Sequence, residues 1–332
     1  MSMNHYCATV ILSFLITLLS TPIVRKIAFI SNFVDRPNPE NPGKIHQKET
    51  ALLGGLPILL GVSTTAFLLG GFGVKTVSIV SLAFLMFVVG LIDDKHGLPY
   101  RPRLLAQSAA AVIFAIAIFN LNMAKSVSGL VILGLAIIWI TGITNAINLM
   151  DNIDGATTGV TALSAGTLLV VALYQRDHLP GILASALLAS ALAFLIFNYN
   201  PASIFLGDAG ALPIGFWLAA VAVIEAKGLL YTSPAKCLAF PFILGFPIYD
   251  TTFATIRRIA LKKPIYIGGE SNLTYRLLSR KISKQKVVFI EYGLQAFFCA
   301  IALCIFWGNV HVASIAIILG GSAPLIIGRL LF

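Results

Sequence analysis

Long apolar runs separated by short polar segments organise this chain from end to end. A helix needs about 20 apolar residues to cross the hydrocarbon core of a bilayer. Runs of that length predict about eleven spans and therefore an all-α, polytopic membrane protein. The predicted spans are 6–24, 53–71, 75–93, 104–121, 127–145, 156–174, 180–198, 211–226, 234–256, 287–308 and 311–330.

The composition agrees with this pattern. Of 332 residues, 58% are hydrophobic and 11% are charged, and the mean hydropathy is +0.92. Soluble domains carry about a quarter charged residues. Since the spans cannot form separate soluble domains, we expect one integral membrane domain over residues 1–332, with the basic segment 257–286 as a loop inside it.

The net charge of +10 suggests nucleic acid as a partner, but the placement of the cations favours another origin. Cytoplasmic loops of membrane proteins carry an excess of Lys and Arg. With the N-terminus outside and the C-terminus cytoplasmic, 18 cations lie on the inner side and 5 on the outer side. We therefore expect no nucleic-acid partner. The outer cations are Lys75, Lys125, Arg176, Lys227 and Lys236.

In this topology the acids gather at the cytoplasmic ends of spans. The adjacent carboxylates of Asp93 and Asp94 repel each other unless a cation, a proton or a metal compensates them. The alternative is an ordinary helix end that dips into water. The acids at these span ends and short turns are Asp93, Asp94, Asp151, Asp154, Asp208 and Asp250.

The segment 145–155 places two aspartates and three asparagines within eleven residues, between two apolar runs. An acid at the centre of a membrane helix costs about 2.5–3.5 kcal/mol, which favours a function for Asp151 and Asp154. On a helix, Asn145, Asn148 and Asn152 would share one face. A polar helix-packing network is the alternative, but two uncompensated acids suit it poorly.

Asp208 stands between Gly207 and Gly210, after a helix that Pro201 should interrupt. A glycine-flanked acid at the membrane interface suits a hard metal such as Mg²⁺, although an Asp also forms turns. Mg²⁺ is usually held by one or two carboxylates plus substrate phosphates.

Cations surround these acids along the sequence. The segment 257–286 holds nine basic residues and one acid, Glu270, and Arg101 and Arg103 follow Asp94 closely. Such cations bind either a polyphosphate or anionic lipid headgroups. Carboxylates and cations on one face favour a site that joins a soluble phosphate-bearing substrate to a lipid phosphate. A transporter would place its acids nearer the bilayer midplane.

Five ordered motifs strengthen this interpretation. Together they resemble the polyprenyl-phosphate N-acetylhexosamine-1-phosphate transferase family over almost the whole chain. The Leu before the Gly pair is more similar to the GlcNAc-type enzymes, since the MurNAc-pentapeptide enzymes usually carry Met there. The motifs are 33–38 with His46, 53–56, 93–94, 148–151 with 154–155, and 205–210.

The resemblance implies a fold of ten or eleven helices, Mg²⁺ (with Mn²⁺ as a substitute), and transfer of a sugar 1-phosphate from a UDP-sugar to a polyprenyl phosphate, with release of UMP. It implies the first membrane step of cell-envelope glycan synthesis, at the cytoplasmic face of the bacterial inner membrane. The expected partners are the donor, the acceptor and the bilayer, and a homodimer is left open.

The resemblance also implies roles for individual residues. Asp208 and Asn148 would hold the metal, while Asp93 or Asp94 would orient or deprotonate the lipid phosphate or act electrostatically. The other implied substrate-binding residues are Arg103 for phosphate, Asp151 and Asp154 for the nucleotide, Phe205 near uracil, and Asn272 and Arg276 in the last cytoplasmic loop.

The last loop departs from the family pattern. Asn272, Thr274 and Tyr275 stand where the family usually has histidines, and only Arg276 and Leu277 survive. Asn and Tyr can hydrogen-bond a diphosphate or a sugar, but they carry no positive charge. Three hypotheses remain: transfer from UDP-GlcNAc, the same chemistry with MurNAc-pentapeptide or another amino-sugar donor, and a non-catalytic relative that binds lipid phosphate or a partner.

Overall fold

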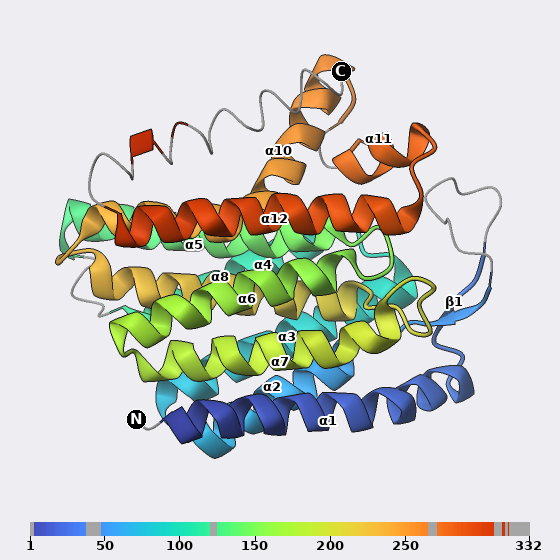
Figure 1. Cartoon of the computed structure of the whole chain (residues 1–332), viewed down its shortest axis with the longest axis horizontal. Helices are drawn as coiled ribbons and strands as arrows, with labels where there is room; N and C mark the ends of the chain where they lie inside the picture. Colours follow the sequence, from blue (N-terminus) through green and yellow to red (C-terminus); the bar gives the residue numbers. More distant parts are fainter. Residues whose placement is uncertain are drawn as a thin grey trace.

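In the computed structural model, long helices lie side by side (Figure 1). It describes residues 3–37, 48–119, 125–264 and 271–308, together with 314, 315 and 318. The long helices are α1 (Met3–Ile30), α2 (Gly55–Gly70), α3 (Val74–His96), α4 (Tyr100–Ile118), α5 (Val127–Met150), α6 (Ala156–Gln175), α7 (His178–Asn198), α8 (Asp208–Leu229) and α12 (Lys284–Trp307).

Shorter elements connect them. The strands β1 (Val34–Asp35) and β2 (Thr50–Ala51) pair antiparallel. The 3-10 helix η2 (Pro234–Leu238) leads into α9 (Ala239–Ile243) and α10 (Gly245–Ala260), and α11 (Leu273–Ser279) lies inside the predicted basic loop.

The helical membrane architecture is confirmed, but the count of eleven spans is not. Within the described ranges, eight helices are long and apolar enough to cross a bilayer, or nine if one bent pair forms a single span. Helix α2 has 16 residues and is about 24 Å long, short of the roughly 30 Å hydrocarbon core. The predicted span 311–330 lies outside the described residues except for three positions, and the orientation of the termini stays a prediction.

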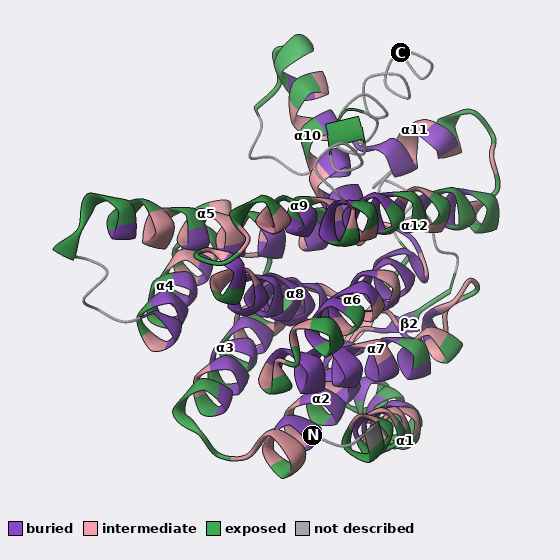
Figure 2. Cartoon of the chain, turned by 60° about the vertical axis from the view of Figure 1, so that its left-hand side comes forward, coloured by how far each residue is buried: buried purple, intermediate pink, exposed green. Residues whose placement is uncertain are grey.

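Helix α8 forms the centre of the bundle. It is apolar on all sides, as expected of a helix enclosed by others, and nearly all its side chains are buried (Figure 2). Helices α2, α3, α5, α6 and α7 all pack against it. The outer helices α1 and α5, by contrast, expose apolar side chains such as Leu19 and Ile138, where lipid would cover them.

Helix α3 comes very close to the start of α8 at Gly90. A Cβ atom at this position would overlap the carbonyl group of Asp208. Only glycine allows this contact without a shift of one helix. The close approach brings the last turn of α3, with Asp93 and Asp94, alongside the first residue of α8.

The predicted helix over 234–256 is wrong in one respect, because it is broken. Residues Pro234–Ile243 and Gly245–Ala260 meet at an angle of 68°. Pro247 cannot donate a helical hydrogen bond, and the buried amide of Gln295 on α12 bridges the break. Gln295 accepts from the Phe246 N–H at 3.1 Å and donates to the Ile243 carbonyl at 2.7 Å. These bonds satisfy backbone groups that lipid could not.

Beyond this break, α10 carries Asp250, which helps to fix α11. The Asp250 carboxylate accepts from the Leu273 N–H at 2.8 Å. The Thr274 hydroxyl donates to buried Glu291 of α12 at 2.6 Å. Helices α10 and α12 therefore hold α11 in place, and some of its side chains face these two helices instead of solvent.

The close contact at Gly90 generates a stability prediction. Gly90→Ala should lower the free energy of unfolding by roughly 1–3 kcal/mol, because the added methyl group overpacks the α3–α8 contact. Thermal unfolding in detergent measures this change. Gly142→Ala on α5 is the matched control, since its Cβ would meet open space; equal melting temperatures for both variants would contradict the assignment.

Candidate active site

A polar cavity of about 210 Å³ lies where α3 and α5 end and α8 begins. It contains five of the residues singled out from the sequence, and these come from segments far apart along the chain. The lining residues are Asp35, Leu52, Asp94, Asp151, Asn152, Ile153, Asp154, Asn198, Phe205, Leu206, Gly207, Asp208 and Tyr275.

Asp94 fixes the beginning of α8. Its Oδ1 accepts from the Asp208 N–H at 2.9 Å, and its Oδ2 accepts from the Ala209 N–H at 3.0 Å. Gly207 precedes the helix with φ +68°, and a Cβ there would lie 2.7 Å from Asp94 Oδ2. A side chain at residue 207 would therefore both strain the backbone and displace the carboxylate.

Arg103 on α4 lies between the carboxylates of Asp93 and Asp208. Its Nη1 donates to Asp93 Oδ2 at 2.8 Å and lies 3.9 Å from Asp208 Oδ2. The second oxygen of Asp93 accepts from the Leu98 N–H at 2.7 Å. Arg103 thus compensates the negative charge of buried Asp93, and its guanidinium also lies near the partly exposed carboxylate of Asp208.

Asn148 lies on the opposite side of Asp208. Its side-chain amide donates to Asp208 Oδ1, so Asp208 sits between an amide from α5 and a guanidinium from α4. The predicted shared helical face is wrong beyond residue 150, because α5 ends at Met150. Asn152 and Asp154 lie in the following turn, where Gly155 adopts φ +83°.

Asp151 and Asp154 in this turn have different surroundings. Withdrawal from solvent, together with the negative charges of Asp208 and Asp154, raises the pKa of Asp151 to about 7. Asp154 Oδ2 accepts from the Asn200 side chain at 2.9 Å and from the Ala202 N–H at 3.1 Å. Asp154 therefore also ties the turn to the loop before α8.

Phe205 reaches the cavity through that loop. The loop runs beside β2: Phe205 N donates to the Ala51 carbonyl at 2.8 Å, and Gly54 N donates to the Phe205 carbonyl at 3.0 Å. The motif 53–56 therefore contacts the motif 205–210 directly. This pairing gives the ring of Phe205 a defined place in the cavity wall.

The last cytoplasmic loop contributes Tyr275, which is not among the site residues predicted from the sequence. Tyr275 on α11 lines the cavity, whereas Asn272 is buried at the start of α11. The Asn272 side chain accepts from the Tyr275 N–H and donates to the Leu149 carbonyl, both at 3.4 Å. Arg276 is half-buried outside the cavity lining, so substrate contacts of Asn272 and Arg276 stay predictions.

Asp35, Asn152 and Asn198 were also missed as lining residues. Asp35 belongs to the motif 33–38, which could have drawn attention to it. Asn198 is buried and accepts from the Gly155 N–H at 3.1 Å and from Thr158 Oγ1 at 2.6 Å. Residue His46 and residues 265–270 of the basic segment lie outside the described residues.

The site has the donor chemistry for a hard metal ion. Asp94, Asp151 and Asp93 all act electrostatically on Asp208, against the single guanidinium of Arg103. Among the described side chains, no three Asp, Glu, His or Cys residues form a ready metal-binding group. The residues therefore fit a metal that takes one or two ligands from the protein and the others from substrate phosphates.

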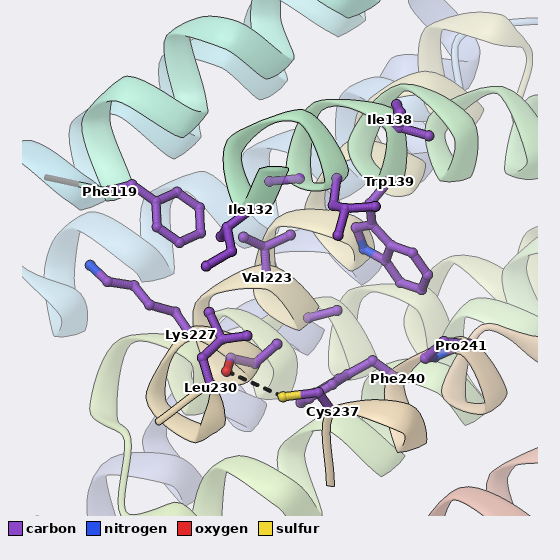
Figure 3. Close-up of a pocket in the computed structure, with 14 residues that line it drawn as sticks. Phe119, Ile132, Ile138, Trp139, Val223, Lys227, Leu230, Cys237, Phe240 and Pro241 are labelled. Atoms are coloured by element: carbon purple, nitrogen blue, oxygen red, sulfur yellow. Dashed lines mark hydrogen bonds between the residues drawn. The ribbon is translucent and has the colours of Figure 1, made fainter. Parts of the chain in front are cut away.

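A larger cavity, of about 320 Å³, lies at the other end of α8 (Figure 3). Its walls are apolar, with Trp139, Val223 and Phe240 among them, and Lys227 lies at one side. The Lys227 ammonium donates to the Ile118 carbonyl at 2.6 Å and lies over the Phe119 ring. Among the described residues that line this larger cavity there is no acid.

Comparison with known proteins finds a matching family and relatives that are similar over most of the chain. Residues 76–226 match glycosyl transferase family 4, a stretch that holds Asp93, Asp94, Arg103, Asn148 and Asp208. The chain is 32% identical over 321 residues to a probable undecaprenyl-phosphate N-acetylglucosaminyl 1-phosphate transferase of Bacillus subtilis, covering 93% of this chain and 88% of the relative.

Two further relatives have names that differ in the sugar transferred. An undecaprenyl-phosphate α-N-acetylglucosaminyl 1-phosphate transferase of Thermotoga maritima is 27% identical, covering 88% of this chain and 87% of its own length. A phospho-N-acetylmuramoyl-pentapeptide-transferase of Halalkalibacterium halodurans is 30% identical, covering 67% of this chain and 75% of its own length.

The two bonds from Asp94 to α8 generate a prediction about stability. Asp94→Asn should lower the free energy of unfolding by roughly 1.5–3 kcal/mol, because an amide group would replace one charged acceptor and point a donor at a backbone N–H. Thermal unfolding measures the loss. Asp177→Asn is the matched control, since Asp177 precedes α7 without a capping side-chain bond. An Asp94→Asn variant as stable as this control would refute the capping role.

Proposed function

The chain belongs to glycosyl transferase family 4, and on that premise we propose that it transfers N-acetylglucosamine 1-phosphate from UDP-GlcNAc to a polyprenyl phosphate and releases UMP. The observation that carries this proposal is the position of Asp208. It lies at the end of a membrane helix, between Arg103 and Asn148, and at the edge of a cavity large enough to receive part of a nucleotide.

The location at the end of three long helices suits a lipid acceptor. A polyprenyl chain stays in the hydrocarbon region and presents its phosphate at headgroup depth, where α3 and α5 end and α8 begins. The side chain of Arg103 is 21% exposed. Its guanidinium can therefore donate to a phosphate while it keeps its hydrogen bond to Asp93. Guanidinium groups bind phosphate oxygens with charge-assisted hydrogen bonds.

In the proposed reaction an oxygen of the acceptor phosphate attacks the β-phosphorus of the donor. A new P–O bond forms there, and the bond from the β-phosphorus to the oxygen that bridges it to the α-phosphorus breaks. That oxygen leaves with UMP. Asp208 and Asn148 would hold Mg²⁺, which when bound neutralises charge on the phosphates as the bond breaks.

Asp93 and Asp94 act by positioning in this proposal. Both oxygens of Asp94 accept backbone N–H groups of α8, and both oxygens of Asp93 accept hydrogen bonds from Leu98 and Arg103. A phosphate monoester has its second pKa near 6, so the acceptor is largely ionised at neutral pH. It therefore needs no carboxylate to remove a proton before it attacks.

The remaining cavity residues are assigned to the donor. Phe205 offers an aromatic face for uracil, and Asp151 and Asn152 in the turn after α5 offer hydrogen-bonding groups for the nucleoside. Tyr275 lies in the same lining and can bind the sugar or the diphosphate through its hydroxyl group.

GlcNAc is favoured over MurNAc-pentapeptide as the transferred sugar. The relatives named for N-acetylglucosaminyl transfer align with 93% and 88% of this chain, whereas the relatives named for muramoyl-pentapeptide transfer align with 63% to 85%. The Leu before the Gly pair at 54–55 is the residue that favours GlcNAc. We place the protein in the bacterial cytoplasmic membrane with the polar cavity facing the cytoplasm, and a homodimer stays a prediction.

A donor panel tests the proposed function. Purified protein with Mg²⁺, undecaprenyl phosphate and UDP-GlcNAc should release UMP, measured by chromatography. Asp208→Asn should lower the rate by at least about a hundredfold, because it removes charge at the reacting phosphates. Asp177→Asn, at the far end of α6 and α7, should keep full activity. Release of UMP from UDP-MurNAc-pentapeptide alone would replace the proposed donor, and no release from any UDP-sugar would overturn the function.

Metal removal gives an independent prediction. Excess EDTA should abolish UMP release, because the crowded carboxylates would repel the donor's diphosphate without a cation between them. Added Mg²⁺ should restore the rate, and Mn²⁺ should restore part of it. Full activity in EDTA would exclude the proposed metal role of Asp208 and Asn148.

A further inference from the structure

A second layer of polar side chains lies one helical turn deeper than the site. Gln107 follows Arg103 by four residues on α4, and Thr144 precedes Asn148 by four residues on α5. Since α4 begins beside the site and α5 ends there, both residues lie about 6 Å farther into the bundle. Each is only 1% exposed.

The polar atoms of this layer have no hydrogen-bond partners in the described part of the chain. This holds for Nε2 and Oε1 of Gln107 and for the hydroxyl of Thr144. An unpaired buried amide destabilises a fold, and native proteins contain few such groups. A leucine or methionine of similar volume would avoid this cost, so a specific reason is needed for the amide.

The packing of α4 shows which way this layer faces. Arg103 lies 3.9 Å from Asp208 at the start of α8. Farther along the same face of α4, Phe114 packs edge to face against Phe216 of α8, with ring centroids 5.8 Å apart. Gln107 lies between these two residues along α4, on the side of the helix that holds both of them.

Thr144 approaches the same part of α8 from the other side. A Cβ added to Gly215 would lie 2.7 Å from the Cα of Thr144, so the two backbones are in close contact. The stretch of α8 between these contacts is apolar, with Ala211 and Leu212 fully buried. On the same face of α4, the polar side chain next to Gln107 is Arg103, one turn closer to the site.

We propose that Gln107 is a positioning residue for the transfer reaction, acting through Arg103. When a substrate phosphate draws the guanidinium away from Asp208, the amide oxygen of Gln107 accepts one of its remaining N–H groups and holds its orientation. This inference rests on the proposed function, because it assigns Arg103 to a substrate phosphate.

A methionine substitution separates this role from a structural one. Gln107→Met keeps the volume and removes both polar atoms. It should lower kcat by about ten- to a hundredfold, as the loss of supporting residues in active sites does, while the donor KM changes by less than about threefold. Its melting temperature should stay equal or rise, because an unpaired amide is removed.

Glu225→Met is the matched control. Glu225 is fully buried on α8, and both of its carboxylate oxygens also lack partners among the described residues. It lies about 25 Å along the helix from Asp208. Its substitution should raise the melting temperature in the same way and leave kcat and KM unchanged.

A double-mutant cycle tests the route through Arg103. In an Arg103→Lys background, Gln107→Met should change kcat by less than about twofold, since coupled residues lose their effect once the partner is altered. Multiplicative effects would overturn the inference, as would an unchanged kcat in Gln107→Met alone or a lowered melting temperature. Wild-type UMP release in the same assay tests the proposed function separately, so an active wild type with a normal Gln107→Met variant refutes only this inference.

Discussion

The site depends on one carboxylate that joins two helices. The first N–H groups of a helix have no partner within it, and a negative charge there is favoured by the helix dipole. Asp94 of α3 accepts two such N–H groups at the start of α8. This contact sets the position of Asp208 relative to α3. It is possible only because Gly90 and Gly207 leave room for the backbone and the carboxylate.

Other side chains satisfy irregular backbone in the same manner. Asp154 holds the loop before α8 through Asn200 and Ala202, and Gln295 closes the break between α9 and α10. In each case a side chain supplies the bond that an interrupted helix or an irregular loop lacks, which lipid cannot supply. Irregular backbone can therefore approach the bilayer and shape a cavity there.

The sequence predicts the long helices and the ordering of the motifs well, because apolar run length and charge patterning are local signals. Asp94, Asp151, Asp154, Phe205 and Asp208 were all identified before the structure brought them into one cavity. The broken helix at Gly245 and the end of α5 at Met150 were missed, since both depend on contacts with distant residues. The same reason applies to α11. Asn272, just before this helix, is buried, whereas Tyr275 within it lines the cavity. Periodicity cannot distinguish them in a helix of seven residues.

The hydrogen-bond partners of the acids change the roles that their sequence positions suggest. From the sequence, Asp93 or Asp94 is expected to orient or deprotonate the lipid phosphate. In the structure, each of the two carboxylates already accepts two hydrogen bonds from the protein. Only Asp208 is placed between a cation and an amide with a side chain that is 31% exposed. A phosphate acceptor brings its own ionised nucleophile, so the protein need not generate one. The proposed reaction requires a fixed arrangement of charges around two phosphates. In that proposal the pair at the end of α3 would provide this arrangement, because it holds Arg103 and the start of α8 in place.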